Sequence, residues 1–165
     1  MITGDEAGFA EFVAARQAAL SRTAYLLTGD HHLAQDLVQA ALMQAASHWR
    51  RIHTSPEAYV RRAMYHQNIS WWRRRRFAES ALGGRDDAAP TVDTDLRLTL
   101  DQALARLTPR QRTVLVLRFY EDLTEVETAR ALSLSTSTVK STTRHALARL
   151  RTLAPELAEL IGADA

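Results

Sequence analysis

The sequence predicts an all-α protein built from two small helical domains joined by a flexible acidic linker. Apolar residues recur at helical spacing along most of the chain, and helix-capping signals stand at several points. Between these periodic segments lies a stretch that loses periodicity and gains Gly, Pro and Asp. We therefore expect the domains to span residues 5–77 and 96–153, with a linker at 78–95 and a C-terminal tail at 154–165.

The N-terminal half contains three expected helices. The first covers residues 7–27 and ends in a turn, and the second covers residues 31–49. The third covers residues 56–77, because Pro56 suits a first helical turn and Ser55 can cap it. The second helix has an apolar stripe of the kind that packs in a core, formed by Leu33, Leu37, Val38, Ala41, Ala45 and Trp49.

The C-terminal half predicts a helix-turn-helix. A helix is expected around residues 96–107, and "TPRQ" then places a capping box at Thr108. "TEVE" repeats this box at Thr124, and Ser135 is the natural cap of the last helix. A helix of about nine residues, a short turn and a second, polar-faced helix form this motif.

The last helix has two chemically different faces. Its apolar face holds Val139, Thr143, Ala146, Leu147, Leu150 and Leu153. Its other face alternates small hydroxyls with cations: Ser137, Lys140, Ser141, Arg144 and Arg151. Such a face suits a helix that approaches a phosphate backbone closely and donates hydrogen bonds to it. An ordinary solvated face would read the same way from these residues alone.

Charge is distributed unevenly along the chain. Residues 1–77 carry ten Arg against six acids, residues 78–99 carry two Arg against five acids, and residues 100–165 carry nine cations against eight acids. Two cationic modules around an acidic joint indicate an anionic partner. The chain has no cysteine, which excludes disulfides and cysteine-based zinc sites. No segment suits membrane insertion and the N-terminus is unlike a signal peptide, so we expect a cytoplasmic protein.

Both halves resemble one family, the extracytoplasmic-function sigma factors of bacterial RNA polymerase. "LTPRQRTVLVLRFYEDLTEVETARALSLSTSTVKSTTRHALARLR" is similar to their minus-35-binding domain. "GDHHLAQDLVQAAL" and "EAYVRRAMYHQNISWWRRRR" are similar to their polymerase-binding and minus-10-binding domain. The resemblance covers about residues 8–153 in the family's order, and "SWWRRRR" is most similar to the short actinobacterial SigE branch.

The resemblance implies a sigma factor, which would localise to the nucleoid when in holoenzyme, and it implies a role for each matching residue. Core RNA polymerase would be bound through its largest-subunit clamp and its flap, promoter DNA would be bound by both domains, and an anti-sigma factor is a candidate partner. The implied polymerase contacts are Asp36, Leu37, Gln39 and Ala40. The implied minus-10 contacts are Tyr59, Arg61, Arg62, Tyr65, Trp71, Arg73 and Arg74. The implied minus-35 contacts are Thr136, Ser137, Thr138, Lys140, Ser141 and Arg144.

Four positions depart from the family's pattern. Ala40 stands where an acid is usual, which weakens the expected clamp contact, and His66 stands where Asn is common, so no role is carried onto it. Ser133 and Ser137 stand where Gly is frequent. Ser133 would then have to adopt a left-handed backbone conformation, and Ser137 would add a donor toward DNA.

Two other classes of function compete with this interpretation. A conventional helix-turn-helix regulator would act without polymerase, but a sensor domain needs neither the "DLVQ" helix nor the basic, aromatic helix after it. A metal enzyme would have to use "GDHH" with Asp36, although adjacent histidines point apart on a helix and no second ligand cluster follows. We therefore expect no catalytic residue, no metal and no cofactor.

Overall fold

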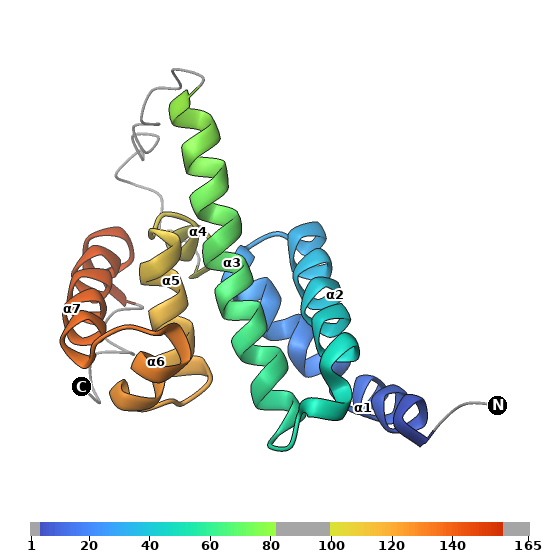
Figure 1. Cartoon of the computed structure of the whole chain (residues 1–165). Helices are drawn as coiled ribbons and strands as arrows, with labels where there is room; N and C mark the ends of the chain where they lie inside the picture. Colours follow the sequence, from blue (N-terminus) through green and yellow to red (C-terminus); the bar gives the residue numbers. More distant parts are fainter. Residues whose placement is uncertain (1–3, 82–99, 157–165) are drawn as a thin grey trace. The chain divides into compact units, whose positions relative to one another are not determined.

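The computed structural model describes residues 4–81 and 100–156, and every regular element within them is helical (Figure 1). This confirms the all-α class. The N-terminal elements are α1 (Gly4–Thr28), α2 (His31–His48), the 3₁₀ turn η1 (Trp49–Arg51) and α3 (Pro56–Ala81). The C-terminal elements are α4 (Leu100–Ala105), α5 (Pro109–Leu115), the π-helical turn η2 (Val116–Tyr120), α6 (Glu125–Leu132) and α7 (Thr136–Leu153).

The chain divides into two compact units, Met1–Asn68 and Ile69–Ala165. This division falls inside α3, whereas the sequence predicts a boundary at residues 77 and 78. Helix α3 continues to Ala81 and so includes the start of the predicted linker. The rest of that linker, the first residues of the helix expected at 96–107 and most of the predicted tail lie outside the described residues.

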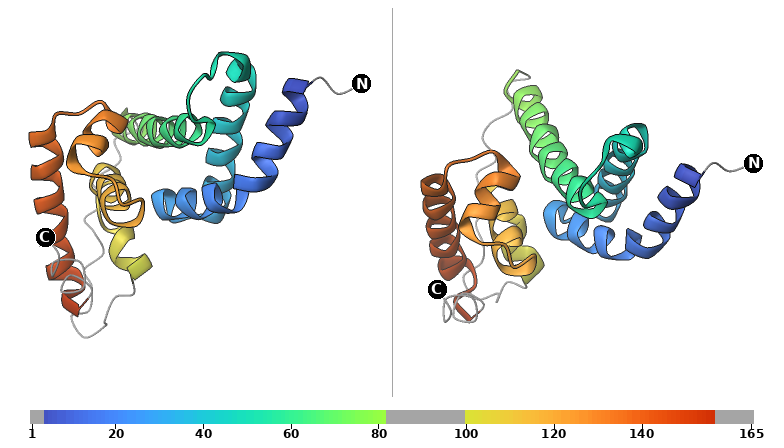
Figure 2. Two further views of the ribbon diagram at one scale, coloured as in Figure 1. Left: turned by 90° about the horizontal axis from the view of Figure 1, so that it is seen from below. Right: turned by 60° about the horizontal axis from the view of Figure 1, so that its bottom comes forward.

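In the first unit α1 and α2 lie side by side (Figure 2). The turn between them uses Gly29 at a φ of 71°, a conformation that glycine adopts without strain. Asp30 then caps α2 by accepting a hydrogen bond from the Leu33 amide at 2.9 Å. The core contains the fully buried side chains of Leu20, Leu37, Val60 and Met64. Trp49 was expected at the end of the second helix, but it lies in η1 and meets the Phe9 ring edge-on at 5.2 Å.

The second unit is assembled from capped helices. Thr108 and Gln111 form the predicted capping box of α5, and Thr124 and Glu127 form that of α6. The core of this unit lies where α4, α5 and α7 meet, and contains Ala103, Leu104, Leu107, Leu115, Ala146, Leu147, Leu150 and Ala154. Helices α6 and α7 with the turn between them form the predicted helix-turn-helix.

Candidate functional site

Helix α7 presents the predicted polar face to solvent. Its opposite side is buried, with Val139, Ala146 and Leu150 fully inaccessible and Leu147 nearly so. Thr143 and Leu153, which the sequence also placed in the stripe, are only half-buried. On the other side Ser137, Lys140 and Arg144 are exposed, whereas Thr136, Thr138 and Ser141 are half-buried. These three residues are therefore the most accessible of the predicted minus-35 contacts.

The hydroxyls at the start of α7 are largely engaged with the helix itself. Ser135 caps α7 by accepting from the Thr138 amide at 3.2 Å, and its oxygen also lies 2.8 Å from the Thr138 hydroxyl. The Ser137 hydroxyl lies 3.1 Å from Ser135 Oγ, and Ser141 donates to the Thr138 carbonyl at 3.2 Å. Such local bonds explain why a helix can begin within a run of Ser and Thr.

The junction between α6 and α7 has the predicted geometry. Ser133 ends α6 at φ 55° and ψ 41°, in the left-handed region that its position in the turn demands. At the other end of α6, the Thr124 amide donates to Glu127 Oε2 at 2.7 Å. This hydrogen bond lowers the pKa of Glu127, with a smaller contribution from the Thr124 hydroxyl.

An ion pair joins the two helices of this motif. Lys140 Nζ of α7 lies 3.7 Å from Glu125 Oε2, at the start of α6. Both side chains reach the surface, with 64% of the Lys140 side chain and 34% of the Glu125 side chain exposed. Glu125 was not predicted from the sequence, because only the packing of α6 against α7 brings it to Lys140.

Helix α2 divides the predicted polymerase contacts between its two sides. Asp36 and Gln39 are exposed and Ala40 is half-buried. Leu37 is fully buried in the core, so its inclusion among the contacts is wrong, because a side chain enclosed by its own domain cannot touch a partner. Met43 was not among the predicted contacts. The residue is 66% exposed, and its spacing of four residues from Gln39 puts both on one side of α2.

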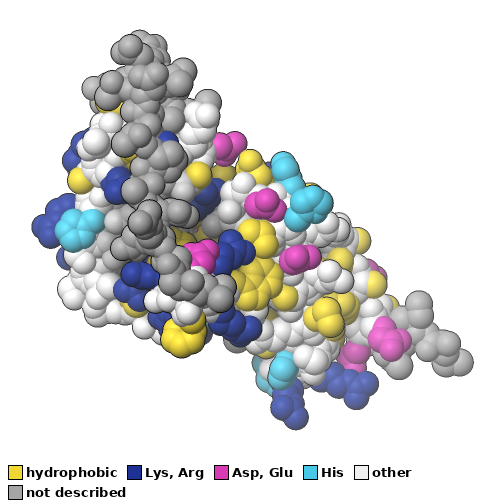
Figure 3. All heavy atoms as spheres, turned by 90° about the horizontal axis from the view of Figure 1, so that it is seen from above, with side chains coloured by type: hydrophobic (Ala, Val, Ile, Leu, Met, Phe, Trp, Pro, Cys, Tyr) yellow, Lys and Arg dark blue, Asp and Glu magenta, His cyan; other side chains and the backbone are white. Residues whose placement is uncertain are grey.

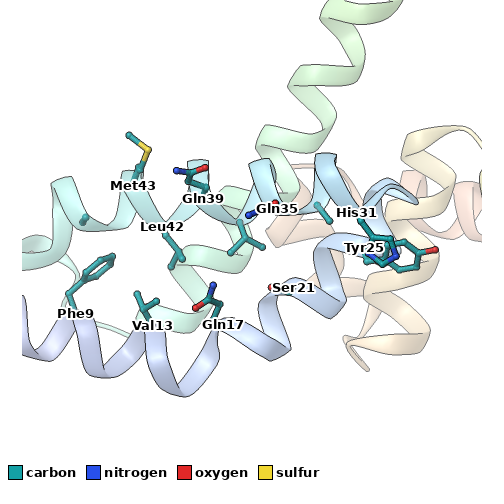
Figure 4. Close-up of a pocket in the computed structure, with 13 residues that line it drawn as sticks. Phe9, Val13, Gln17, Ser21, Tyr25, His31, Gln35, Gln39, Leu42 and Met43 are labelled. Carbon is teal, nitrogen blue, oxygen red and sulfur yellow. The ribbon is translucent and has the colours of Figure 1, made fainter.

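A groove between α1 and α2 adjoins these contacts (Figure 4). It has a volume of about 640 Å³ and includes Gln39 and Met43 among its lining residues, with no Asp, Glu, Lys or Arg. Phe9 and Val13 of α1 point toward Leu42 of α2 across it in Figure 4. At one end the rings of Tyr25 and His31 stack with centroids 4.5 Å apart. An uncharged groove of this kind suits the apolar side of a partner helix.

Arg61 of α3 is held inside its own domain. Its Nη1 donates to the Thr23 hydroxyl of α1 at 2.8 Å, and its Nη2 and Nε donate to Glu57 Oε1 at 2.9 and 3.1 Å. Only 17% of the Arg61 side chain is exposed. The guanidinium joins α3 to α1, so the structure gives Arg61 a structural role beside the DNA contact that the resemblance implies, and that contact stays a prediction. The expected DNA contact of Tyr65 is wrong, because only 3% of this residue is exposed and its own domain encloses the ring.

The other predicted minus-10 residues of α3 do reach the surface. Arg62, Arg73 and Arg74 are exposed, and Tyr59 and Trp71 are half-buried. Arg74 Nη2 donates to the Ser70 hydroxyl at 3.3 Å, and the neighbouring Arg76 lies over the Trp72 ring at 5.3 Å. Cationic side chains reach solvent on the face shown in Figure 3, beside exposed hydrophobic ones. Arginine and aromatic side chains together can hold phosphates and receive unstacked bases.

The acidic residue of the "GDHH" segment is used as a helix cap. Asp30 caps α2, and the Leu33 amide that it accepts from lowers its pKa. Residues 4–81 and 100–156 contain no group of three His, Cys, Asp or Glu that could hold a metal ion. None of the helices in these ranges has the length and apolarity that a membrane span requires.

Comparisons with known proteins assign both units. Residues 12–78 match the family Sigma-70 region 2, and residues 103–152 match Sigma-70, region 4. The RNA polymerase sigma-E factor of Streptomyces avermitilis is 41% identical over 156 residues, which cover 92% of this chain and 87% of that protein. The sigma-E factor of Streptomyces coelicolor is also 41% identical, over 90% of this chain and 86% of that protein.

Two solved structures share the fold. The sigma factor RpoE of Bartonella quintana, solved with the anti-sigma factor NepR, superposes with a TM-score of 0.67 and 22% identity over 88% of this chain and 96% of that one. CnrH, solved with the cytosolic domain of CnrY, superposes with a TM-score of 0.59 and 22% identity over 98% of this chain and 92% of that one. At these identities the two superpositions describe the architecture.

Proposed function

The chain belongs to the sigma-70 family of RNA polymerase sigma factors, and from that premise we propose how its residues divide the work. It binds core RNA polymerase, recognises the minus-35 and minus-10 elements and starts transcription of a specific set of genes. The observation that carries this conclusion is the presence of both sigma regions in one chain, in order. The proposed domains are residues 5–77 and 96–153. The protein acts on DNA in the cell interior, in the nucleoid, as an initiation factor and not as an enzyme.

The second domain reads the minus-35 element through α7. In helix-turn-helix proteins the start of the second helix enters the major groove, and in this chain that segment exposes Ser137, Lys140 and Arg144. The guanidinium of Arg144 is suited to a bidentate contact with a guanine edge. Thr138 and Ser141 support this surface, because their hydroxyls and the Ser135 cap fix the first turns of the helix, and the half-buried Thr136 lies beside them as a further proposed contact.

The first domain binds the polymerase clamp through the exposed side of α2. Asp36 and Gln39 supply the polar contacts, and the half-buried Ala40 lies beside them. We include the exposed Met43 and the adjoining uncharged groove, because they continue the same side of the helix. The occupant would be a helix of the clamp that places its apolar side in the groove. The flap and an anti-sigma factor are further candidate partners.

Helix α3 binds the minus-10 element with the residues that it leaves accessible. Arg62, Arg73 and Arg74 would pair with phosphates, and Tyr59 and Trp71 would face bases as they leave the stack. Each stacked base contributes about 1–3 kcal/mol. Gln44 of α2 donates a hydrogen bond to the Tyr59 hydroxyl at 3.5 Å, which links this side chain to the first domain.

In vitro transcription separates this function from that of a conventional regulator. Run-off transcription with core polymerase, with and without the protein, is compared with a gel shift of the protein alone. We expect weak binding by the free protein, because one helix-turn-helix offers few phosphate contacts. Polymerase should fix both domains on one promoter, raise their effective concentration and produce specific transcripts. Tight, sequence-specific binding by the free protein without any polymerase-dependent transcript would identify a conventional regulator instead.

A further inference from the structure

We propose that Glu125 is a positioning residue that holds Lys140 at the DNA backbone and limits how strongly the second domain binds phosphates. The inference rests on the proposed reading of the minus-35 element by α7. It starts from the ion pair between Lys140 Nζ and Glu125 Oε2, which lie 3.7 Å apart. Glu125 thereby becomes part of the binding surface without having to touch a base.

The packing of the two helices holds the ends of this pair in place. Thr128 and Ala129 of α6 are buried, as is Val139, which precedes Lys140 in α7. The Thr124–Glu127 capping box fixes the first turn of α6, from which Glu125 projects. The backbones that carry the two charges are therefore rigid, and only their side chains retain freedom at the surface.

The pair places the ammonium on the side of α7 that faces the start of α6. In helix-turn-helix complexes the first helix crosses the DNA backbone while the second lies in the groove. A lysine held toward the first helix therefore meets phosphate and not base edges. An ammonium has three donors that can rotate, so Lys140 can bind a phosphate while it stays near Glu125. Arg144, one turn further along α7, remains available for the bases.

Glu125 also weakens the contact that it positions. Its carboxylate neutralises part of the Lys140 charge and would lie close to the same phosphates, which it repels. Fewer counterions are then released on binding, so both the affinity and its dependence on salt decrease. Because a phosphate contact carries no sequence information, this weakening affects all promoters alike. It would make the protein depend on polymerase for stable binding.

The test measures holoenzyme binding to a fluorescent promoter at several salt concentrations. Glu125→Gln keeps the size of the side chain and removes its charge. We expect binding to tighten about two- to fivefold, the range of an exposed ion pair, and the salt slope to steepen by up to about 0.9. The ranking of promoter variants should stay the same. Lys140→Met should weaken binding to all promoters alike. Adding Glu125→Gln to Lys140→Met should then change the affinity and the salt slope little.

Asp122→Asn is the matched control, since it removes one negative charge from the turn before α6. Asp122 has a φ of 56°, which Asn tolerates. Three outcomes would overturn the proposed role of Glu125 in limiting phosphate binding: equal steepening of the salt slope by both variants, an unchanged slope in Glu125→Gln, or an altered ranking of promoters. The proposed function is tested separately by the unaltered protein. If its transcription ignores changes in the minus-35 element, that function fails, whereas a normal minus-35 response with an unchanged slope rejects only the role of Glu125.

Discussion

Replacing Arg61 by alanine should lower the free energy of unfolding of the first domain, whereas replacing its neighbour Arg62 should leave it nearly unchanged. The Arg61 guanidinium makes one hydrogen bond to Thr23 of α1, at 2.8 Å, and two to Glu57, at 2.9 and 3.1 Å. Arg62 is exposed on the same helix. Both variants therefore remove an arginine side chain, Arg61→Ala from a hydrogen-bonded position inside the domain and Arg62→Ala from a position that faces solvent.

The expected loss follows from these contacts. Hydrogen bonds to charged groups contribute about 1.5–3 kcal/mol each, and more is lost when a buried partner is left unpaired. Here both partners keep an alternative, because Glu57 still pairs with Arg16 at 3.3 Å and Thr23 still donates to the Ala19 carbonyl at 3.3 Å. We therefore expect Arg61→Ala to lower the free energy of unfolding by about 2–3 kcal/mol, which is less than the sum of the three bonds because both partners remain paired.

Differential scanning calorimetry of the full chain tests this expectation. A loss of this size lowers the melting temperature of a domain of 60–100 residues by about 10–20 °C. Arg62→Ala should stay within about 0.5 kcal/mol of the unaltered protein and should instead weaken transcription. The melting temperature of Arg61→Lys should lie between those of Arg61→Ala and the unaltered protein, since an ammonium cannot reproduce the planar fork of a guanidinium. If Arg61→Ala melts like the unaltered protein and impairs only DNA binding, the structural assignment of Arg61 is refuted.

Three further expectations concern the other surfaces. Changing Asp36 and Gln39 together to alanine should leave stability within about 0.5 kcal/mol but sharply reduce recovery of core polymerase in a pull-down, and unchanged recovery would reject the clamp contact. Arg144→Ala should lose about 1–3 kcal/mol of discrimination at one base pair of the minus-35 element, measured by transcription from promoter variants; equal loss at every position would make it a phosphate contact. The pKa of Glu127 is lowered by the Thr124 amide, so its contribution to stability is complete above the ordinary carboxyl pKa of about 4.3 and is lost as the pH falls through the lowered folded value. Glu127→Gln can keep the capping hydrogen bond without titrating, so its melting temperature should decline less between pH 5 and 3, and an identical decline would show that the capping carboxylate is not responsible.

Sequence by itself determined the features of this protein that depend on near neighbours. The capping boxes at Thr108 and Thr124 and the cap at Ser135 were all predicted from the residues and are all present. Each involves atoms only a few residues apart, so the identity of the residues is sufficient to predict the bond. The two faces of α7 were predictable for the same reason, because helical spacing alone decides which side chains share a side.

Only the tertiary structure decided which members of a candidate set lie at the surface. Arg61 and Arg62 are chemically identical in the sequence, but the packing of α3 against α1 places a buried threonine beside one and solvent beside the other. Leu37 lies next to the exposed Asp36 and is enclosed by the core. The pair of Glu125 and Lys140 likewise exists only because two helices meet. Contacts between residues distant along the chain depend on how whole elements pack, and no local pattern encodes that geometry.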